Sequence, residues 1–190
     1  MPKAFLDKML QYRQRIEAMK NQNQAYDDAK TFSDDVKAAK QALKDAEDSI
    51  LQNMESTINS QMTRYNDIIY SQTRKAPVIS LGDGTRYEFL TPDDTGTGTS
   101  YKSLIVFDLS ILKLTQLPAL IHDSLIFNDI GYEPLEKIME LYTQSKKQIF
   151  IAFDKKKAPT DAIQKVIDST TVLQLSEGGN ELFGQNWGKK

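Results

Sequence analysis

Apolar residues recur at helical spacing throughout residues 1–72. The first run steps by four and three residues, and a second run follows out of phase with it: Phe5, Met9, Tyr12, Ile16, Met19 and Tyr26, then Phe32, Val36, Ala39, Leu43, Ala46 and Ile50. Such a stripe is typical of the a/d seam of a coiled coil. Residues 1–72 contain no glycine and only Pro2, which favours helix. We therefore expect a helical coiled-coil arm over residues 1–72.

The phase shift between the two runs leaves the form of this arm open. One long helix could carry the shift near residues 26–33, or the chain could turn there into a hairpin. Ser33-Asp34-Asp35 could cap a new helix at that point. A bundle of two or three helices packed on its own domain is the third alternative.

Residues 73–190 follow a different pattern, in which short apolar runs alternate with amphipathic segments. All 9 Gly lie in this part of the chain. Runs 77–81 and 86–90 flank Gly82-Asp83-Gly84-Thr85 and predict a β-hairpin. Strands are expected at 118–121, 148–153 and 171–175, and helices from about 100 to 115, 132 to 146 and 159 to 169. Alternation of this kind predicts an α/β fold with a mainly parallel sheet and flanking helices.

Two of the expected strands end in polar residues, His122-Asp123-Ser124 and Phe153-Asp154-Lys155. Ligands of parallel sheets gather beyond the carboxyl ends of the strands. Side chains alternate faces along a strand, so His122 and Ser124 point away from Asp123 and the three cannot form a catalytic triad together. With a single histidine and no cysteine, a zinc site is also disfavoured. The interpretation that remains is a nucleotide-binding site in which Asp123 supplies a carboxylate.

A loop rich in glycine and hydroxyl residues, 91–100, precedes the expected helix. Backbone amides at a helix N-terminus favour an anion such as phosphate, but a flexible loop with a Thr or Ser N-cap is the simpler interpretation of this stretch alone. Neither Gly82-Asp83-Gly84-Thr85 nor Gly96-Thr97-Gly98-Thr99 continues into Gly-Lys-Ser/Thr, so the chain contains no P-loop. If the chain handles ATP, it supplies only half of a site.

Composition narrows the class of protein further. The net charge of -2 gives no electrostatic case for a nucleic-acid-binding surface over the whole chain. The absence of cysteine fits a reducing cytoplasm. No stretch approaches the roughly 18 apolar residues of a membrane span, and the first residues lack the apolar core of a signal peptide. We expect a cytoplasmic protein without a membrane partner.

The order and spacing of these segments resemble the C-terminal half of split ABC-type ATPases. These include the structural-maintenance-of-chromosomes (SMC) proteins and the double-strand-break-repair ATPase. The stretches TGTGTSYKSLIVFDLSIL, LPALIHDSLIF, KQIFIAFDK and LFGQNW are similar to an uncharacterised bacterial family, which is the C-terminal domain of such proteins. The resemblance implies the C-terminal lobe of an ATPase head over residues 73–190, with the P-loop on an N-terminal half of the same protein.

The resemblance also implies roles for individual residues. Asp123 stands at the Walker B aspartate and would be the metal-binding and catalytic carboxylate. Residues 127–129 fall at the D-loop. Four residues stand in the signature loop, which contacts ATP bound on a second head: Thr97, Gly98, Thr99 and Ser100. The cofactors implied are ATP and Mg²⁺, in the complete head only.

Two positions depart from the pattern of the family. Ser124 occupies the place of the catalytic glutamate, and Phe153 that of the switch histidine. Asp154, beside Phe153, is a candidate cofactor-binding residue. A serine cannot act as a carboxylate base, so the departure at Ser124 puts ATP turnover in doubt.

Two functions follow from different classes. The first is a half-ATPase that drives nucleotide-dependent dimerisation in DNA-associated or antiphage activity. The second is a non-catalytic coiled-coil interaction module on a degenerate ATPase-like core. A P-loop upstream on the same polypeptide would favour the first.

Overall fold

The computed structural model describes residues 3–94, 96–127, 129–153, 159–176 and 180–184. By its internal contacts the chain divides into two compact units, residues 1–53 and residues 54–190. Among the described helices, none is long and apolar enough to cross a lipid bilayer.

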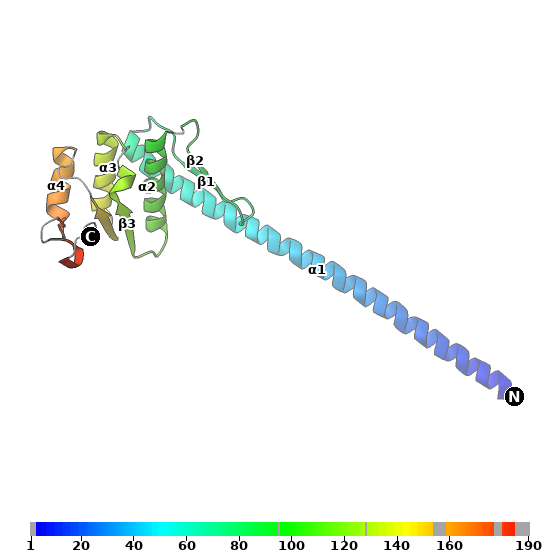
Figure 1. The fold of residues 1–190 in the computed structure, drawn as a ribbon. Coiled ribbons are helices and arrows are strands. Elements are labelled where there is room, and N and C mark those ends of the chain that lie inside the picture. The colour runs from blue at the N-terminus through cyan, green and yellow to red at the C-terminus, as the bar shows by residue number, and fades with distance from the viewer. Residues whose placement is uncertain (1–2, 95, 128, 154–158, 177–179, 185–190) are drawn as a thin grey trace. The chain divides into compact units, whose positions relative to one another are not determined.

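Helix α1 (Lys3–Tyr70) is continuous and passes unbroken through residues 26–33 (Figure 1). The hairpin alternative is therefore not what the structure shows. The sequence there contains no residue that breaks a helix, and a shift of the apolar stripe alone does not interrupt backbone hydrogen bonding. Helix α1 ends where Ser71 and Gln72 adopt left-handed backbone conformations, with φ of 50° and 64°.

The predicted β-hairpin is present. Strands β1 (Val78–Ser80) and β2 (Glu88–Leu90) pair antiparallel, with Ile79 opposite Phe89. The free edge of β1 is bound by α1: the Asn59 amide both donates to the Ile79 carbonyl (2.8 Å) and accepts from its N–H (2.9 Å). This reciprocal pair satisfies the edge as a neighbouring strand would.

The second sheet is parallel and consists of β3 (Ala119–Asp123) and β4 (Gln148–Ala152). Their register places Asp123 opposite Ala152, so the carboxyl ends of both strands lie at one edge. Helix α2 (Thr97–Leu114) precedes β3, while the short 3₁₀ helix η1 (Ser124–Phe127) and helix α3 (Tyr132–Thr143) connect β3 to β4. Helix α4 (Asp161–Thr170) and the short helix η2 (Leu182–Gly184) follow.

The predicted strand at 171–175 is wrong. These residues belong to no strand, and Val172 is 94% exposed. The local sequence favours a strand, but a strand forms only when a neighbour offers its hydrogen-bonding edge. The fold is thus mixed α/β and mostly helical, with one small parallel sheet.

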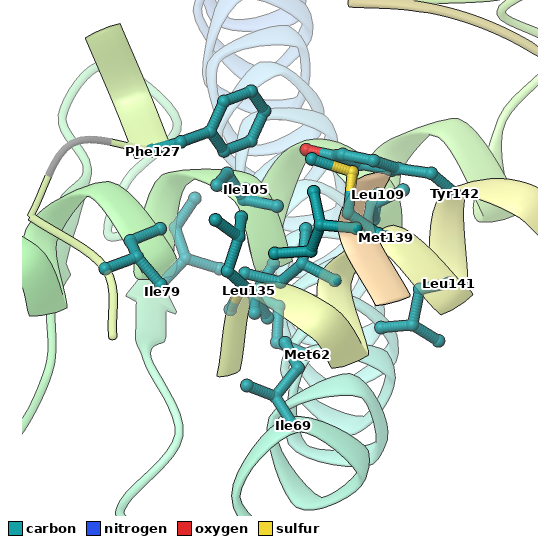
Figure 2. Packing of buried hydrophobic residues seen from close by; sticks show 14 residues of the cluster. Met62, Ile69, Ile79, Ile105, Leu109, Phe127, Leu135, Met139, Leu141 and Tyr142 are labelled. Carbon is teal, nitrogen blue, oxygen red and sulfur yellow. The ribbon is translucent and has the colours of Figure 1, made fainter. Parts of the chain in front are cut away.

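The core of the second unit lies between the C-terminal part of α1 and helices α2 and α3. Figure 2 shows these side chains converging from the three helices, with Phe127 of η1 at one side. The helix residues that contribute are Met62, Ile69, Ile105, Val106, Leu109, Leu135, Ile138, Met139, Leu141 and Tyr142. This core packs α2 against the end of η1, at Phe127, and these elements carry the candidate site.

Candidate functional site

The predicted signature-like loop forms the first turn of α2. Helix α2 begins at Thr97, with Gly96 as an extended N-cap residue that offers no side-chain cap. Asp94 instead holds the residues on either side of the helix start, since its carboxylate accepts from the Gly96 N–H (3.2 Å) and from the Thr99 hydroxyl (2.8 Å). These two hydrogen bonds, that of Thr99 first, hold the pKa of Asp94 below its usual value.

The loop residues differ in how far solvent reaches them. Thr97 and Ser100 are exposed, Gly98 is half-buried, and Thr99 is buried. Thr99 therefore supports the loop through Asp94, whereas the exposed Ser100 donates its hydroxyl to the Gly96 carbonyl (3.2 Å) and Thr97 is exposed to solvent. A helix N-terminus with exposed hydroxyls can bind an anion.

Gly98 brings this loop against the segment that follows η1. A Cβ atom built on Gly98 would lie 2.2 Å from the carbonyl oxygen of Asp129 and 3.1 Å from its carbonyl carbon. Only glycine permits an approach this close. The structure thus places the predicted signature loop beside Asp129 of the predicted D-loop, whereas Asn128 lies outside the described residues.

Asp123 ends β3 on its exposed face. Its Oδ1 accepts from the Ser124 N–H at 2.6 Å and lies 3.4 Å from the Ser124 hydroxyl. In the described part of the chain no group donates to Oδ2, which leaves this oxygen available to a ligand. Ser124, the first residue of η1, is buried.

The remaining predicted site residues lie beyond β4. Phe153 is half-buried, and its ring packs 6.3 Å from that of Phe127. Asp154 lies outside the described residues. No hydrogen bond or ion pair between described residues joins the signature-like loop to Asp123. The structure therefore places the predicted signature-like loop and the predicted Walker B aspartate on the same unit without a direct bond between them.

A single exposed carboxylate needs further ligands to hold a metal ion. In the described ranges, no group of three or more His, Asp or Glu side chains lies together in a way that could bind one. Asp123 fits an Mg²⁺ site only if other groups, such as phosphate oxygens, complete the coordination.

Lys102 is a residue that the sequence reasoning missed. Its side chain is 1% exposed, and its ammonium group lies 3.1 Å from Asn66 Oδ1 and 5.2 Å from the centre of the Tyr70 ring. Burial lowers the pKa of Lys102 to about 8, a shift that the Asp94 charge opposes and the Arg74 charge adds to. Lys102 thus links the end of α1 to the first turns of α2.

His122 is held in a second polar cluster that the sequence did not reveal. Its ring nitrogens contact Asp108 of α2 (3.0 Å) and Tyr142 of α3 (2.6 Å). One signal was available in the sequence: Lys102 and Tyr142 both occupy positions of an otherwise apolar helical stripe. A polar group at such a position needs a buried partner.

Comparison with known proteins gives a family. The model of a family described as "Uncharacterised protein conserved in bacteria (DUF2326)" matches residues 65–187. The chain belongs to the DUF2326 family. The match to DUF2326 includes the loop at α2 and both strands of the parallel sheet.

The fold has a solved counterpart. A structure from work on ATP-driven dimerization and DNA-stimulated activation of SMC ATPases is similar with a TM-score of 0.50 and 10% identity, over 70% of this chain and 84% of that chain. At this identity the likeness shows the fold alone. No curated protein has a sequence similar enough to match.

Proposed function

We propose that the chain is the C-terminal half of a split, SMC-like ABC-type ATPase head. Residues 1–72 would form the arm, and residues 73–190 the lobe that supplies the signature-like loop and the Walker B aspartate. The observation that carries the proposal is the pair of half-sites: a hydroxyl-bearing helix N-terminus and an exposed carboxylate at the end of a parallel strand. The missing P-loop and the likeness of the fold to an SMC ATPase structure support it.

In this proposal each half-site serves a different neighbour. Asp123 would bind Mg²⁺ together with ATP held by the P-loop half of the same protein. Thr97, Gly98, Thr99 and Ser100 would contact ATP on a second head, and Asp154 would lie near the nucleotide. ATP and Mg²⁺ supply the phosphoryl-transfer chemistry, while the residues of this chain position them and close the interface.

The partners follow from the same arrangement. The P-loop half and a second head come first, and DNA is a further partner, because the similar structure comes from work on dimerization and DNA stimulation. We propose that this nucleotide-driven dimerisation takes place in the cytoplasm and serves a DNA-associated or antiphage function.

Head engagement tests the proposal through Ser100, which is exposed in the first turn of α2. In the complete protein with its P-loop half, Ser100→Arg should leave ATP binding intact and abolish ATP-dependent dimerisation. The bulk and charge of arginine would fill the space for the opposite nucleotide. Gln116→Arg, an exposed change beyond the other end of α2, is the matched control. ATP-dependent dimerisation of the Ser100→Arg protein at the level of the control would refute the proposal.

A second candidate function is the non-catalytic interaction module, and the geometry at Ser124 favours it. Ser124 stands where a carboxylate base is needed, is buried, and its amide is bonded to Asp123. This module would bind a partner through the arm and never turn over ATP. Dimerisation of the complete protein that needs no ATP, together with no phosphate release, would select the module over the ATPase.

A further inference from the structure

A buried imidazole joins three elements of the second unit. The His122 side chain, on β3, is 6% exposed, with Nε2 3.0 Å from Asp108 Oδ2 on α2 and Nδ1 2.6 Å from the Tyr142 hydroxyl on α3. The His122 and Tyr142 rings also pack with centres 5.7 Å apart. Both ring nitrogens are therefore occupied.

The donors in this cluster follow from the chemistry of its members. An ionised carboxylate can only accept, so His122 donates from Nε2–H to Asp108. Burial, and then the Asp108 charge, raises the pKa of Tyr142, so its phenol keeps its proton. With the Nε2 proton directed at Asp108, the Tyr142 O–H donates to Nδ1, so a single ring proton on Nε2 gives each of the three side chains a hydrogen-bond partner.

This arrangement leaves His122 unable to act as a base toward Asp123. Its ring lies on the buried face of β3, whereas Asp123 lies on the exposed face. His122 is connected to Asp123 by the backbone of β3. The strand ends at Asp123, whose carboxylate accepts from the Ser124 N–H.

We propose that His122 is a positioning residue, fixed as the Nε2–H tautomer between Asp108 and Tyr142, which holds the end of β3 in place against α2 and α3. These two hydrogen bonds of His122 would set the positions of Asp123 and Ser124 relative to α2, the helix that carries the signature-like loop. This role of His122 deepens the proposed function, on which it rests only for the role of Asp123.

The tautomer can be measured directly, because His122 is the only histidine in the chain. Nitrogen-15 NMR of the imidazole at neutral pH should show a protonated Nε2 and an unprotonated, hydrogen-bonded Nδ1. Tyr142→Phe should shift the Nδ1 signal, and Asp108→Leu should mix the tautomers. Asp108→Asn should preserve the wild-type pattern, since its amide oxygen still accepts.

The positioning role is read at the Ser124 amide by hydrogen exchange. Loss of one buried hydrogen bond in Tyr142→Phe should accelerate exchange of this amide roughly tenfold. Tyr132→Phe, which removes an exposed hydroxyl from the same helix, should leave it unchanged.

An Nδ1–H tautomer in the wild-type chain overturns the proposal, and this result needs no variant to fold. Unchanged exchange at Ser124 in folded Tyr142→Phe overturns it as well. Neither measurement uses ATP. If the proposed function is wrong, the Ser100→Arg protein will dimerise normally with ATP. That result is independent of the hydrogen bonds from His122 to Asp108 and Tyr142, which the two measurements above test.

Discussion

Gly98 lies at the contact between the first turn of α2 and the backbone of Asp129, where a methyl group would come within 2.2 Å of a carbonyl oxygen. Alanine normally stabilises a helix relative to glycine. Gly98→Ala should nevertheless lower the unfolding free energy by about 1–3 kcal/mol, because the backbone must move to relieve the overlap.

Urea unfolding of Gly98→Ala and Gly96→Ala tests this expectation. A Cβ on Gly96 would meet nothing closer than 3.5 Å, so this variant should lose less stability although it weakens the N-cap position. Equal or greater stability of Gly98→Ala than of wild type would contradict the contact.

Lys102 makes stability depend on pH in a defined window. The pKa of Lys102 is about 8 in the folded chain, against 10.5 for a lysine in water. Between these values the unfolded chain binds more protons, so the unfolding free energy should rise with pH, by at most about 1.4 kcal/mol per pH unit. The rise should appear from about pH 8 to pH 9.5, below the titration of tyrosine.

Lys102→Met is the control for this prediction. Methionine keeps much of the apolar volume and removes the charge, so the slope in that window should disappear. Chemical unfolding at several pH values measures both chains. Identical slopes for wild type and Lys102→Met would show that Lys102 is not the titrating group.

Asp123 and Ser124 make separate predictions in the complete protein with its P-loop half. Asp123→Asn would remove the negative charge that Asp123 offers to Mg²⁺ in the proposed site, and it should reduce turnover by on the order of a hundredfold or more. Ser124→Ala should cost little, because a serine is not the base. Steady-state ATPase assays with Mg²⁺ measure both variants. Full activity of Asp123→Asn, or complete loss of activity in Ser124→Ala, would contradict the proposed roles of these two residues.

Helices and hairpins that depend on residues close in sequence could be predicted from the sequence. Strand pairing and buried polar contacts, which depend on residues distant in sequence, could not. The β-hairpin is a local structure, and it was confirmed. The strand at 171–175 was wrong, because its pairing partner had to come from elsewhere. The partners of His122 lie on helices 14 and 20 residues away in sequence, and strand alternation alone could not identify them.

The arm carries its own prediction. Along α1 in the first unit the large apolar residues of the seam are exposed, including Phe5, Met9, Ile16, Met19 and Tyr26. An exposed stripe of this spacing drives association with another helix. The isolated chain should therefore self-associate in a concentration-dependent way through residues 1–53.

Analytical ultracentrifugation with paired variants tests the seam. Ile16→Glu should weaken association by about tenfold or more, since it places a charge in the apolar stripe. Gln14→Glu changes charge equally outside the stripe and should have little effect. A chain that stays monomeric at all concentrations, with or without residues 1–31, would argue against an exposed seam.

For the whole molecule, the two half-sites and the missing P-loop make a joint prediction. The amides and lysine of a P-loop provide most of the affinity of such proteins for phosphate, and this chain has neither in the required spacing. In the proposed function, the loop at α2 and the carboxylate of Asp123 would only add contacts to nucleotides that other groups hold. The isolated chain should thus neither bind ATP measurably nor hydrolyse it.

Calorimetric titration with ATP and Mg²⁺ measures this directly, on a chain shown to unfold cooperatively. No binding heat is expected up to millimolar nucleotide, and addition of the P-loop half should restore binding. The loop at α2 and Asp123 lie on one unit, and cooperative unfolding shows that this unit is folded. Absent ATP binding by the isolated chain would therefore reflect the missing P-loop and not an unfolded site. A dissociation constant at or below about 1 μM, equivalent to roughly 8 kcal/mol, would require a complete nucleotide site within this chain and would refute the half-site proposal.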